Sequence, residues 1–187
     1  MPPVFVITGP SGAGKGTLIR ELLERVPQLE LAVSATTRGI RPGEQDGVDY
    51  WFVSQDDFER RVAAGDFLEH VRYVSGRCYG TLLSEVERIA GCGRVCVLEL
   101  ETEGALEVHE RVPGAVTIFI SAPVGELERR LRARATESDG EIDDRVALAR
   151  SQLRQAGLFD HVVENDRVER AVDELERVVR RELERAG

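Results

Sequence analysis

The sequence lacks any apolar run that approaches the roughly 20 residues needed to span a lipid bilayer. It also leaves no room for a signal peptide, because an apolar strand pattern begins at Val4. Cysteine is scarce, and Cys78, Cys92 and Cys96 are too few and too scattered for a disulfide framework or a metal site. We therefore expect a cytoplasmic protein with reduced thiols and no membrane partner.

An excess of basic residues is also missing. Lysine and arginine total 25 against 34 acidic residues, which gives a formal net charge of −9. This balance disfavours binding to long nucleic acids, which need a broad basic surface. A small anionic ligand remains possible if cations are concentrated in a cleft. The length of 187 residues and the 42% hydrophobic content fit one globular domain.

Lysine is almost absent, since 24 of the 25 basic residues are arginine and the exception is Lys15. Lys15 lies in a glycine-rich loop between the apolar run at 4–7 and a helical pattern that starts at Thr17. Glycines let backbone N–H groups approach a phosphate, and the helix N-terminus adds partial positive charge. This pattern predicts a P-loop that binds a nucleoside triphosphate such as ATP. The predicted loop residues are Ser11, Gly12, Ala13, Gly14, Lys15, Gly16 and Thr17.

Gly16 follows Lys15 at the position where P-loops often carry a hydroxyl for Mg²⁺. The nearest hydroxyl, on Thr17, comes one residue later. We therefore expect Mg²⁺ to be held mainly by nucleotide phosphates and water, with no dedicated protein metal site.

Apolar runs alternate with helical patterns along most of the chain. Strands are predicted at 4–8, 94–100, 116–120 and 161–163, and helices at 15–26, 102–112, 124–134, 142–155 and from 167 onward. The last helix carries an apolar stripe of Val172, Leu175, Val179 and Leu183. The alternation predicts an α/β fold, a P-loop NTPase-type parallel sheet flanked by helices, with its ligand at the carboxyl ends of the strands.

The stretch from 31 to about 81 differs from this pattern. It carries short strand patterns at 31–35, 50–53 and 67–74, and one helix that Ser54 and Asp57 begin as a capping box. We predict a small mixed-β subdomain inserted beside the core. The polar segment 134–144 is predicted to be a mobile lid between two helices.

A second anion site is predicted in the inserted subdomain. Arg38 and Arg41 lie three residues apart in a loop broken by glycine and proline, which lets two guanidinium groups converge on one phosphate. Tyr50 and Tyr79 offer hydroxyl donors to the same group. The alternative is an exposed basic loop without a ligand.

Several motifs of the sequence resemble those of a known family. Thr-Thr-Arg-x-x-Arg-x-Gly-Glu at 36–44 and Asp-Gly-x-Asp-Tyr at 46–50 are similar to the GMP-binding region of guanylate kinases. The resemblance continues in order through Phe-Leu-Glu at 67–69, Tyr-Gly-Thr at 79–81, Leu-Glu-Leu-Glu at 98–101, the arginines near 130–145 and Val-x-Asn at 163–165. It covers nearly the whole chain.

The resemblance implies residue roles and a reaction, the ATP-dependent phosphorylation of GMP and also of dGMP. The GMP phosphate would be held by Arg38, Arg41, Tyr50 and Tyr79, and the guanine base by Ser34, Glu69, Thr81 and Glu101. The ATP phosphates and the transferred group would contact Lys15, Arg130, Arg134 and Arg145, and Glu99 is a weaker candidate for the water shell of Mg²⁺. The implied division is a core at 1–32, 82–125 and 146–187, a GMP-binding subdomain at 33–81 and a lid at 126–145.

This chain departs from the family pattern in three places. Glu99 and Glu101 stand where many relatives have aspartate, Ala135 replaces a frequent glycine, and Gly16 gives a loop closer to that of adenylate kinases. Two alternatives therefore stay open: another nucleoside monophosphate kinase, and a non-catalytic binding module of guanylate-kinase type. The oligomeric state is not predicted.

Overall fold

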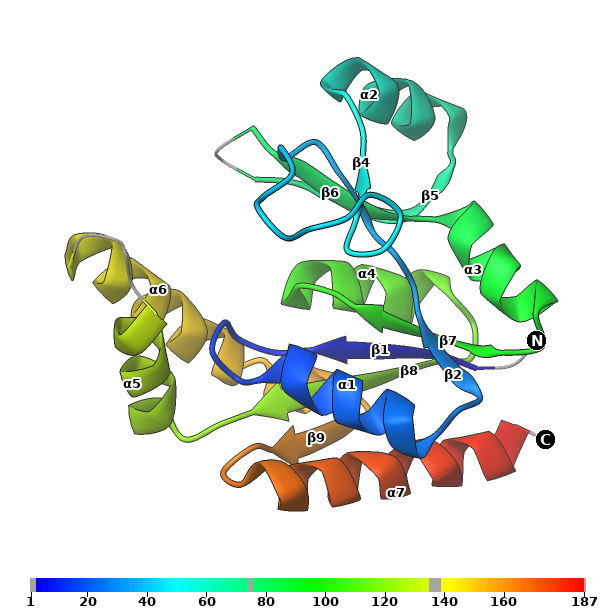
Figure 1. The fold of residues 1–187 in the computed structure, drawn as a ribbon. Helices are drawn as coiled ribbons and strands as arrows, with labels where there is room; N and C mark the ends of the chain where they lie inside the picture. The colour runs from blue at the N-terminus through cyan, green and yellow to red at the C-terminus, as the bar shows by residue number, and fades with distance from the viewer. Residues whose placement is uncertain (1–2, 74–75, 135–138, 187) are drawn as a thin grey trace.

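A computed structural model describes residues 3–73, 76–134 and 139–186, with the backbone alone for 134 and 139–142. The chain builds two sheets (Figure 1). The core sheet has the strand order β2 (Leu29–Leu31), β7 (Val95–Glu99), β1 (Val4–Thr8), β8 (Ala115–Ser121) and β9 (His161–Glu164). All of its strand pairs are parallel, as the alternation of strands and helices predicts.

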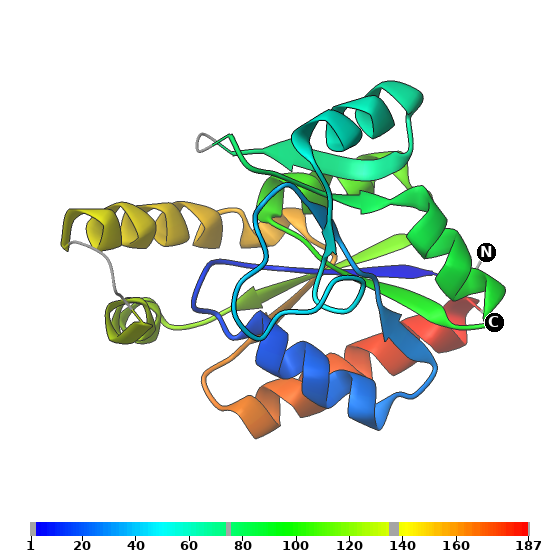
Figure 2. The same ribbon diagram turned by 45° about the horizontal axis from the view of Figure 1, so that its top comes forward.

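Helices cover both faces of the core sheet (Figures 1 and 2). Because side chains alternate along a strand, Phe5 and Ile7 of β1 face one side and Val6 the other. The first side packs against α1 (Lys15–Arg25) and α7 (Val168–Ala186), and the second against α3 (Leu83–Gly91) and α4 (Thr102–Arg111). The central strand is thereby fixed, and with it the loop that follows it.

The apolar stripe predicted on the last helix forms the contact of α7 with the core. Val172, Leu175 and Val179 are buried, and Leu183 packs against the same cluster. On the solvent side, Arg25 of α1 donates to Asp173 at 2.6 Å. Such an exposed ion pair adds at most about 1 kcal/mol, so burial of the stripe is the larger contribution to docking of α7.

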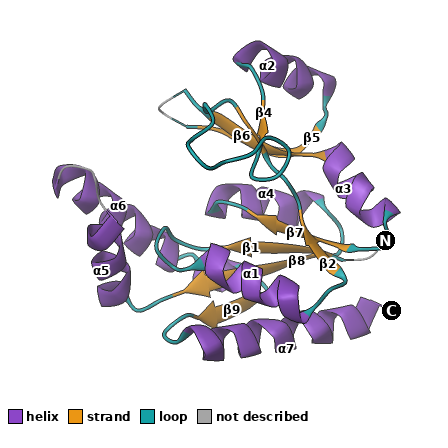
Figure 3. Ribbon diagram, in the orientation of Figure 1, coloured by secondary structure: helices purple, strands orange, loops and turns teal. Residues whose placement is uncertain are grey.

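The second sheet is mixed and small (Figure 3). Its order is β4 (Trp51–Phe52), β3 (Ala35–Thr36), β6 (Cys78–Leu82) and β5 (Phe67–Arg72), with β3 and β4 parallel and the other pairs antiparallel. The helix α2 (Gln55–Ala64) buries Phe58 against it. The predicted cap is confirmed, because the Ser54 hydroxyl accepts a bond from the Asp57 N–H at 3.1 Å.

Several expectations on this region were wrong in detail. The strand predicted at 31–35 is two strands, since Leu31 pairs with Val97 in the core sheet and Ala35 with Gly80 in the second sheet. Neither β6 nor α3 was predicted. Gly80 interrupts the apolar pattern of β6, and α3 begins after Leu82, which supplies no side-chain cap.

The predicted lid is helical at all of its described residues. α5 (Val124–Arg134) ends where expected, but α6 (Asp139–Leu153) begins three residues earlier than predicted. A short 3₁₀ turn (Ala156–Leu158) follows α6. Both helices lie beyond the carboxyl end of β1, next to the loop that leads into α1 (Figures 1 and 2).

Candidate active site

One cavity of about 760 Å³ joins the core sheet to the second sheet. It collects residues from the glycine-rich loop, from the ends of β2 and β7, from the second sheet and from α6. Its lining includes Ser11, Lys15, Ser34, Arg41, Asp49, Tyr50, Glu69, Tyr73, Arg77, Tyr79, Glu99, Glu101 and Arg145. The cavity thus brings together many of the candidate residues named from the sequence, although they come from distant parts of the chain.

The glycine-rich loop has the backbone shape that its composition suggests. Gly9, Gly12 and Gly14 have φ angles of 141°, 86° and 88°, which side chains of L-residues rarely tolerate. A Cβ at Gly9 would lie 2.2 Å from the carbonyl oxygen of Ile120. The loop thus packs tightly on β8 and leads directly into α1, which begins at Lys15. The N-terminus of this helix can bind an anion.

Lys15 is held within its own loop. Its Nζ donates to the carbonyl oxygen of Gly9 at 2.8 Å and to that of Pro10 at 3.4 Å. These contacts fix the ammonium group at the cavity, where its charge is not neutralised by a carboxylate in the described residues. Gly16 is exposed in the first turn of α1, and the Thr17 N–H donates to the Gly14 carbonyl at 3.1 Å.

Asn165 supports the loop from behind. Its side-chain amide donates to the carbonyl oxygen of Ala13 at 2.7 Å, and a Cβ at Gly14 would lie 2.5 Å from the same nitrogen. Asn165 is 1% exposed, so this bond is made away from water, where a polar contact contributes most. The Val-x-Asn motif at 163–165 therefore braces the phosphate loop in this structure.

Two of the three predicted lid arginines contact the loop. Arg130 of α5 donates to the carbonyl oxygen of Gly12 at 3.3 Å, and Arg145 of α6 donates to the hydroxyl of Ser11 at 3.3 Å. Arg145 also lines the cavity. The side chain of Arg134 and all of Ala135 lie outside the described residues.

Glu69 is a buried carboxylate at the far side of the cavity. It is 4% exposed, and its Oε1 accepts a bond from the Thr81 hydroxyl at 2.8 Å. Burial raises the pKa of Glu69, and the bond from Thr81 opposes this rise. Gly104 of α4 makes the position possible, because a Cβ there would lie 3.1 Å from Oε2. One carboxylate oxygen is thus satisfied, and the group faces the cavity that Ser34 and Glu101 also line.

Glu99, at the end of β7, lines the cavity near Lys15. Desolvation raises the pKa of its carboxyl group, the charge of Lys15 lowers it, and the charge of Glu101 raises it further. Within the described residues, Glu99 makes no hydrogen bond or ion pair with its side chain. A carboxylate in this position is a hard oxygen donor, suited to bind Mg²⁺ directly or through water.

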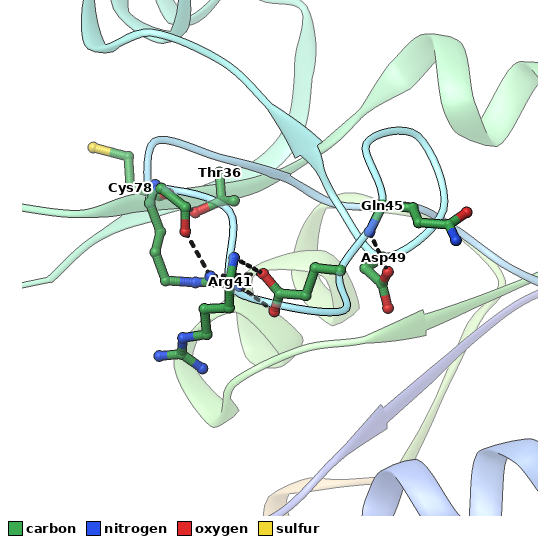
Figure 4. A network of polar contacts seen from close by, with 8 residues as sticks. Thr36, Arg41, Gln45, Asp49 and Cys78 are labelled. Atoms are coloured by element: carbon green, nitrogen blue, oxygen red, sulfur yellow. Dashed lines mark hydrogen bonds and ion pairs between the residues drawn. The ribbon is translucent and has the colours of Figure 1, made fainter.

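The two arginines of the predicted anion site have different surroundings in the structure (Figure 4). Arg38 is 7% exposed and donates to both carboxylate oxygens of Glu44, at 2.9 and 2.8 Å, and to the carbonyl of Gly39. Its guanidinium also lies 5.3 Å from the ring centre of Tyr50. Arg38 does not line the cavity, whereas Arg41 does. In the described residues the Arg41 guanidinium makes no hydrogen bond, and Figure 4 shows it extending away from the loop.

The two predicted tyrosines are neighbours. The rings of Tyr50 and Tyr79 meet edge to face with centres 6.0 Å apart, and both line the cavity. Desolvation raises the pKa of Tyr50, so its hydroxyl stays protonated and can donate to an anion at neutral pH. Arg41, Tyr50 and Tyr79 together form the side of the cavity that is suited to a phosphate.

The comparisons with known proteins agree with this geometry. The family model described as guanylate kinase matches residues 1–182. A guanylate kinase from Rubrobacter xylanophilus is 47% identical over 179 residues, which cover 95% of this chain and 93% of the relative. The chain belongs to the guanylate kinase family.

Two further matches support this assignment. A guanylate kinase from a Synechococcus strain is 46% identical over 172 residues, which cover 91% of each chain. The crystal structure of guanylate kinase from Anaplasma phagocytophilum superposes with a TM-score of 0.78 at 28% identity, covering 97% of this chain and 86% of that one. The resemblance and the P-loop NTPase-type fold are thereby confirmed. Guanylate kinases are nucleoside monophosphate kinases, so the chain is assigned to the phosphotransferases.

Three cavity residues with polar side chains were not among the candidates from sequence: Asp49, Tyr73 and Arg77. The last two had a readable signal. In extended chain, alternate residues share a face, so Glu69 predicts that Tyr73, directly after β5, faces the same side, and Tyr79 predicts the same of Arg77, directly before β6. The signal could be used only once β6 was known to pair with β5.

No helix of the described residues is long and apolar enough to cross a membrane. They also contain no group of three or more histidine, cysteine, aspartate or glutamate side chains placed to hold a metal ion.

Proposed function

We propose that this member of the guanylate kinase family transfers the terminal phosphoryl group of ATP to GMP, giving ADP and GDP, and also accepts dGMP. One observation carries the proposal. A single cavity contains both a phosphate loop, with Lys15, and a buried carboxylate, Glu69, facing a phosphate-suited cluster of arginine and tyrosine side chains. Two phosphorylated ligands can therefore meet within one cleft.

The ATP side of the cavity is the glycine-rich loop. Main-chain N–H groups from residue 11 to residue 17 and the N-terminus of α1 would bind the phosphates, and Lys15 would move from its carbonyl partners to the outer phosphate oxygens. Arg130 and Arg145 already contact the loop, and Arg134 is proposed to join them. Their charges would stabilise the transferring group, as phosphoryl transfer requires.

The guanine end is assigned to Glu69, with Ser34, Thr81 and Glu101 completing the base contacts. A carboxylate accepts hydrogen bonds and matches the N1–H and N2–H donors of guanine. Adenine has an acceptor at N1, so it would leave a buried carboxylate oxygen facing a lone pair, which is strongly unfavourable. The Thr81 hydroxyl already orients Glu69 for this role.

The GMP phosphate is assigned to Arg38, Arg41, Tyr50 and Tyr79. Arg41 and the two tyrosines line the cavity, and Arg38 lies directly behind Tyr50. In this proposal Arg38 contributes its positive charge from behind Tyr50, while its guanidinium stays hydrogen-bonded to Glu44. The subdomain at 33–81 would bind GMP, and the core would bind the phosphates of ATP. The lid at 126–145 would close over these phosphates.

Mg²⁺ is proposed to bind with ATP. The donor set fits, since the Glu99 carboxylate lines the cavity and makes no bond to a described residue, and Thr17 carries a hydroxyl in the first turn of α1. When bound, the ion supplies positive charge to the phosphate oxygens. The attacking GMP phosphate is already an anion, so the chain provides no general base and acts by positioning and charge. The proposal places this reaction in the cytoplasm, without nucleic acid or membrane partners.

A coupled assay of ADP release tests the proposal. We expect turnover with GMP and with dGMP, and none above background with AMP, CMP or UMP. Lys15→Ala should reduce kcat by at least about 100-fold with little change in GMP affinity, since the lost ammonium acts on the transferring phosphate. A preference for AMP would establish a different monophosphate kinase, and GMP binding without turnover would establish a binding module.

A further inference from the structure

The face of the hairpin formed by β5 and β6 extends beyond the residues assigned above. Glu69 pairs with Thr81, and Val71 pairs with Tyr79. The next pair along is Tyr73 with Arg77, joined by the Tyr73 N–H to Arg77 carbonyl bond at 2.9 Å. Since alternate residues share a face, the third pair lies on the cavity side, and both of its members line the cavity.

The order of these pairs follows the expected length of the substrate. The Glu69 and Thr81 pair is assigned to the base, and Tyr79, one pair further, to the phosphate. Two residues of a strand advance about 7 Å, so the backbone of Arg77 lies about 7 Å beyond that of Tyr79. The long side chain of Arg77 can span this distance to the phosphate assigned to Tyr79. Next to Arg77, the Gly76 N–H donates to the Tyr73 carbonyl at 2.8 Å, which adds a second backbone bond between the two ends of the hairpin.

Tyr73 packs this end of the hairpin onto the phosphate cluster. Its ring meets that of Tyr79 edge to face, with centres 5.4 Å apart. Tyr79 in turn contacts Tyr50. Burial raises the pKa of Tyr73, and the nearby carboxylate of Glu101 raises it further, so its hydroxyl remains a donor. The backbone of Arg77 is thus fixed against the tyrosines that are assigned to the phosphate.

The charges of the cavity explain why a further cation is useful. The dianionic phosphate of a nucleoside monophosphate would meet Asp49 and Glu101 in the same cavity. Arg38 is already neutralised by Glu44. Among the described residues, the Arg77 side chain makes no hydrogen bond or ion pair. A cation without a carboxylate partner, beside an anion site in a chain of net charge −9, attracts an anionic ligand most effectively.

We propose that Arg77 is an additional substrate-binding residue, which contacts the phosphate of the monophosphate substrate opposite Arg41. This inference rests on the proposed function and deepens it. Arg77 would take the place beside Arg41, near the tyrosines, that Arg38 leaves because it pairs with Glu44. It also assigns the residue to binding rather than to the chemical step, because Lys15 and Arg145 lie at the other phosphate group.

Arg72 offers a matched control. It is on the same hairpin and is exposed, but it lies on the opposite face and donates to Glu59 at 2.7 Å. Arg77→Ala and Arg72→Ala therefore change the net charge equally and differ in their distance from the cavity. Arg77→Lys keeps the charge and loses the planar fork, so it should restore part of the binding.

The experiment measures KM and kcat for GMP and ATP, and the affinity of GMP and guanosine by calorimetry. For Arg77→Ala we expect KM and Kd for GMP to rise about 10-fold or more, with KM for ATP and the affinity for guanosine unchanged. Arg72→Ala should change each value by less than about twofold. An unchanged Kd for GMP in Arg77→Ala, an equal loss with guanosine, or an equal loss in Arg72→Ala would each overturn the inference. A wild-type protein that binds GMP but fails to phosphorylate it would defeat the proposed function alone, because the calorimetry still tests Arg77.

Discussion

The contact between Gly104 and Glu69 gives a sharp test of how the base site is built. Gly104 lies in the first turn of α4 and has no positive φ angle, so alanine is compatible with its backbone. A Cβ at this position would lie 3.1 Å from Glu69 Oε2 and 3.7 Å from its Cδ. Gly104→Ala should therefore have two effects: it should stabilise α4 and displace the carboxylate of Glu69.

The two effects can be sized separately. Replacing glycine by alanine in a helix stabilises the fold by about 0.5–1 kcal/mol, which raises Tm by about 1–4 °C in a chain of this size. The carboxylate must retreat by about 0.3 Å to reach ordinary contact, and Thr81 resists this movement. A misplacement of about 1 Å costs about 100-fold in rate, so 0.3 Å corresponds to about fourfold in kcat/KM for GMP.

Calorimetric Tm and steady-state kinetics measure both effects. The control is Gly125→Ala, in the first turn of α5, where a Cβ has no neighbour within 4 Å. The control should gain stability with unchanged kinetics, whereas Gly104→Ala should lose activity toward GMP while KM for ATP stays constant. Unchanged kcat/KM for GMP in Gly104→Ala would refute the argument that this glycine positions Glu69.

Three further predictions concern the buried carboxylate, the phosphate loop and the substrate loop. Because burial raises the pKa of Glu69, its ionised form destabilises the free protein once pH exceeds the unfolded-state value of about 4.3. Glu69→Gln should thus raise Tm at about pH 7.5, lose this gain below about pH 4, and weaken discrimination between GMP and AMP. Gly9→Ala should cost about 2–6 kcal/mol in unfolding free energy, because its Cβ meets the Ile120 carbonyl at 2.2 Å with φ at 141°. Glu44→Gln should lower Tm and raise KM for GMP, because one of the two bonds to Arg38 loses its charged acceptor.

Each of these predictions has a clear contrary result. A Tm of Glu69→Gln equal to wild type at both pH values would mean that the carboxylate is not desolvated in solution. A Gly9→Ala variant with normal Tm and ATP affinity would contradict the tight packing of the loop on β8. If Glu44→Gln leaves KM for GMP unchanged, the loop that carries Arg41 does not depend on this ion pair.

The features that were predictable from sequence are local ones. The strand β1, the glycines and Lys15 lie within twelve residues, and each limits the conformation of the next, so the phosphate loop could be predicted in full. The same holds for the cap of α2 and for the stripe of α7, where period alone defines the buried face.

The second sheet could not be predicted in the same way, because its pairs are distant in sequence. Ala35 pairs with Gly80, and β4 pairs in parallel with β3, which nothing in the short runs 35–36 and 51–52 indicates. Gly80 gives no strand signal, yet it is required, since a Cβ there would lie 2.7 Å from the carbonyl oxygen of Glu69. Close approach of two backbones selects the glycine, and a single sequence does not reveal the approach.

The arginines show where residue type stops being informative. Arg38 and Arg41 look equivalent in the sequence, but Glu44 takes both the guanidinium of Arg38 and the backbone N–H of Arg41. That ion pair fixes the loop and leaves Arg41 available to a ligand. Arg77, by contrast, belongs to none of the motifs named from the sequence, and it reaches the cavity because β5 and β6 pair in one register. The positive charge available to a ligand therefore depends on which arginines form ion pairs within the protein. The strand pairing of the second sheet determines where those arginines lie.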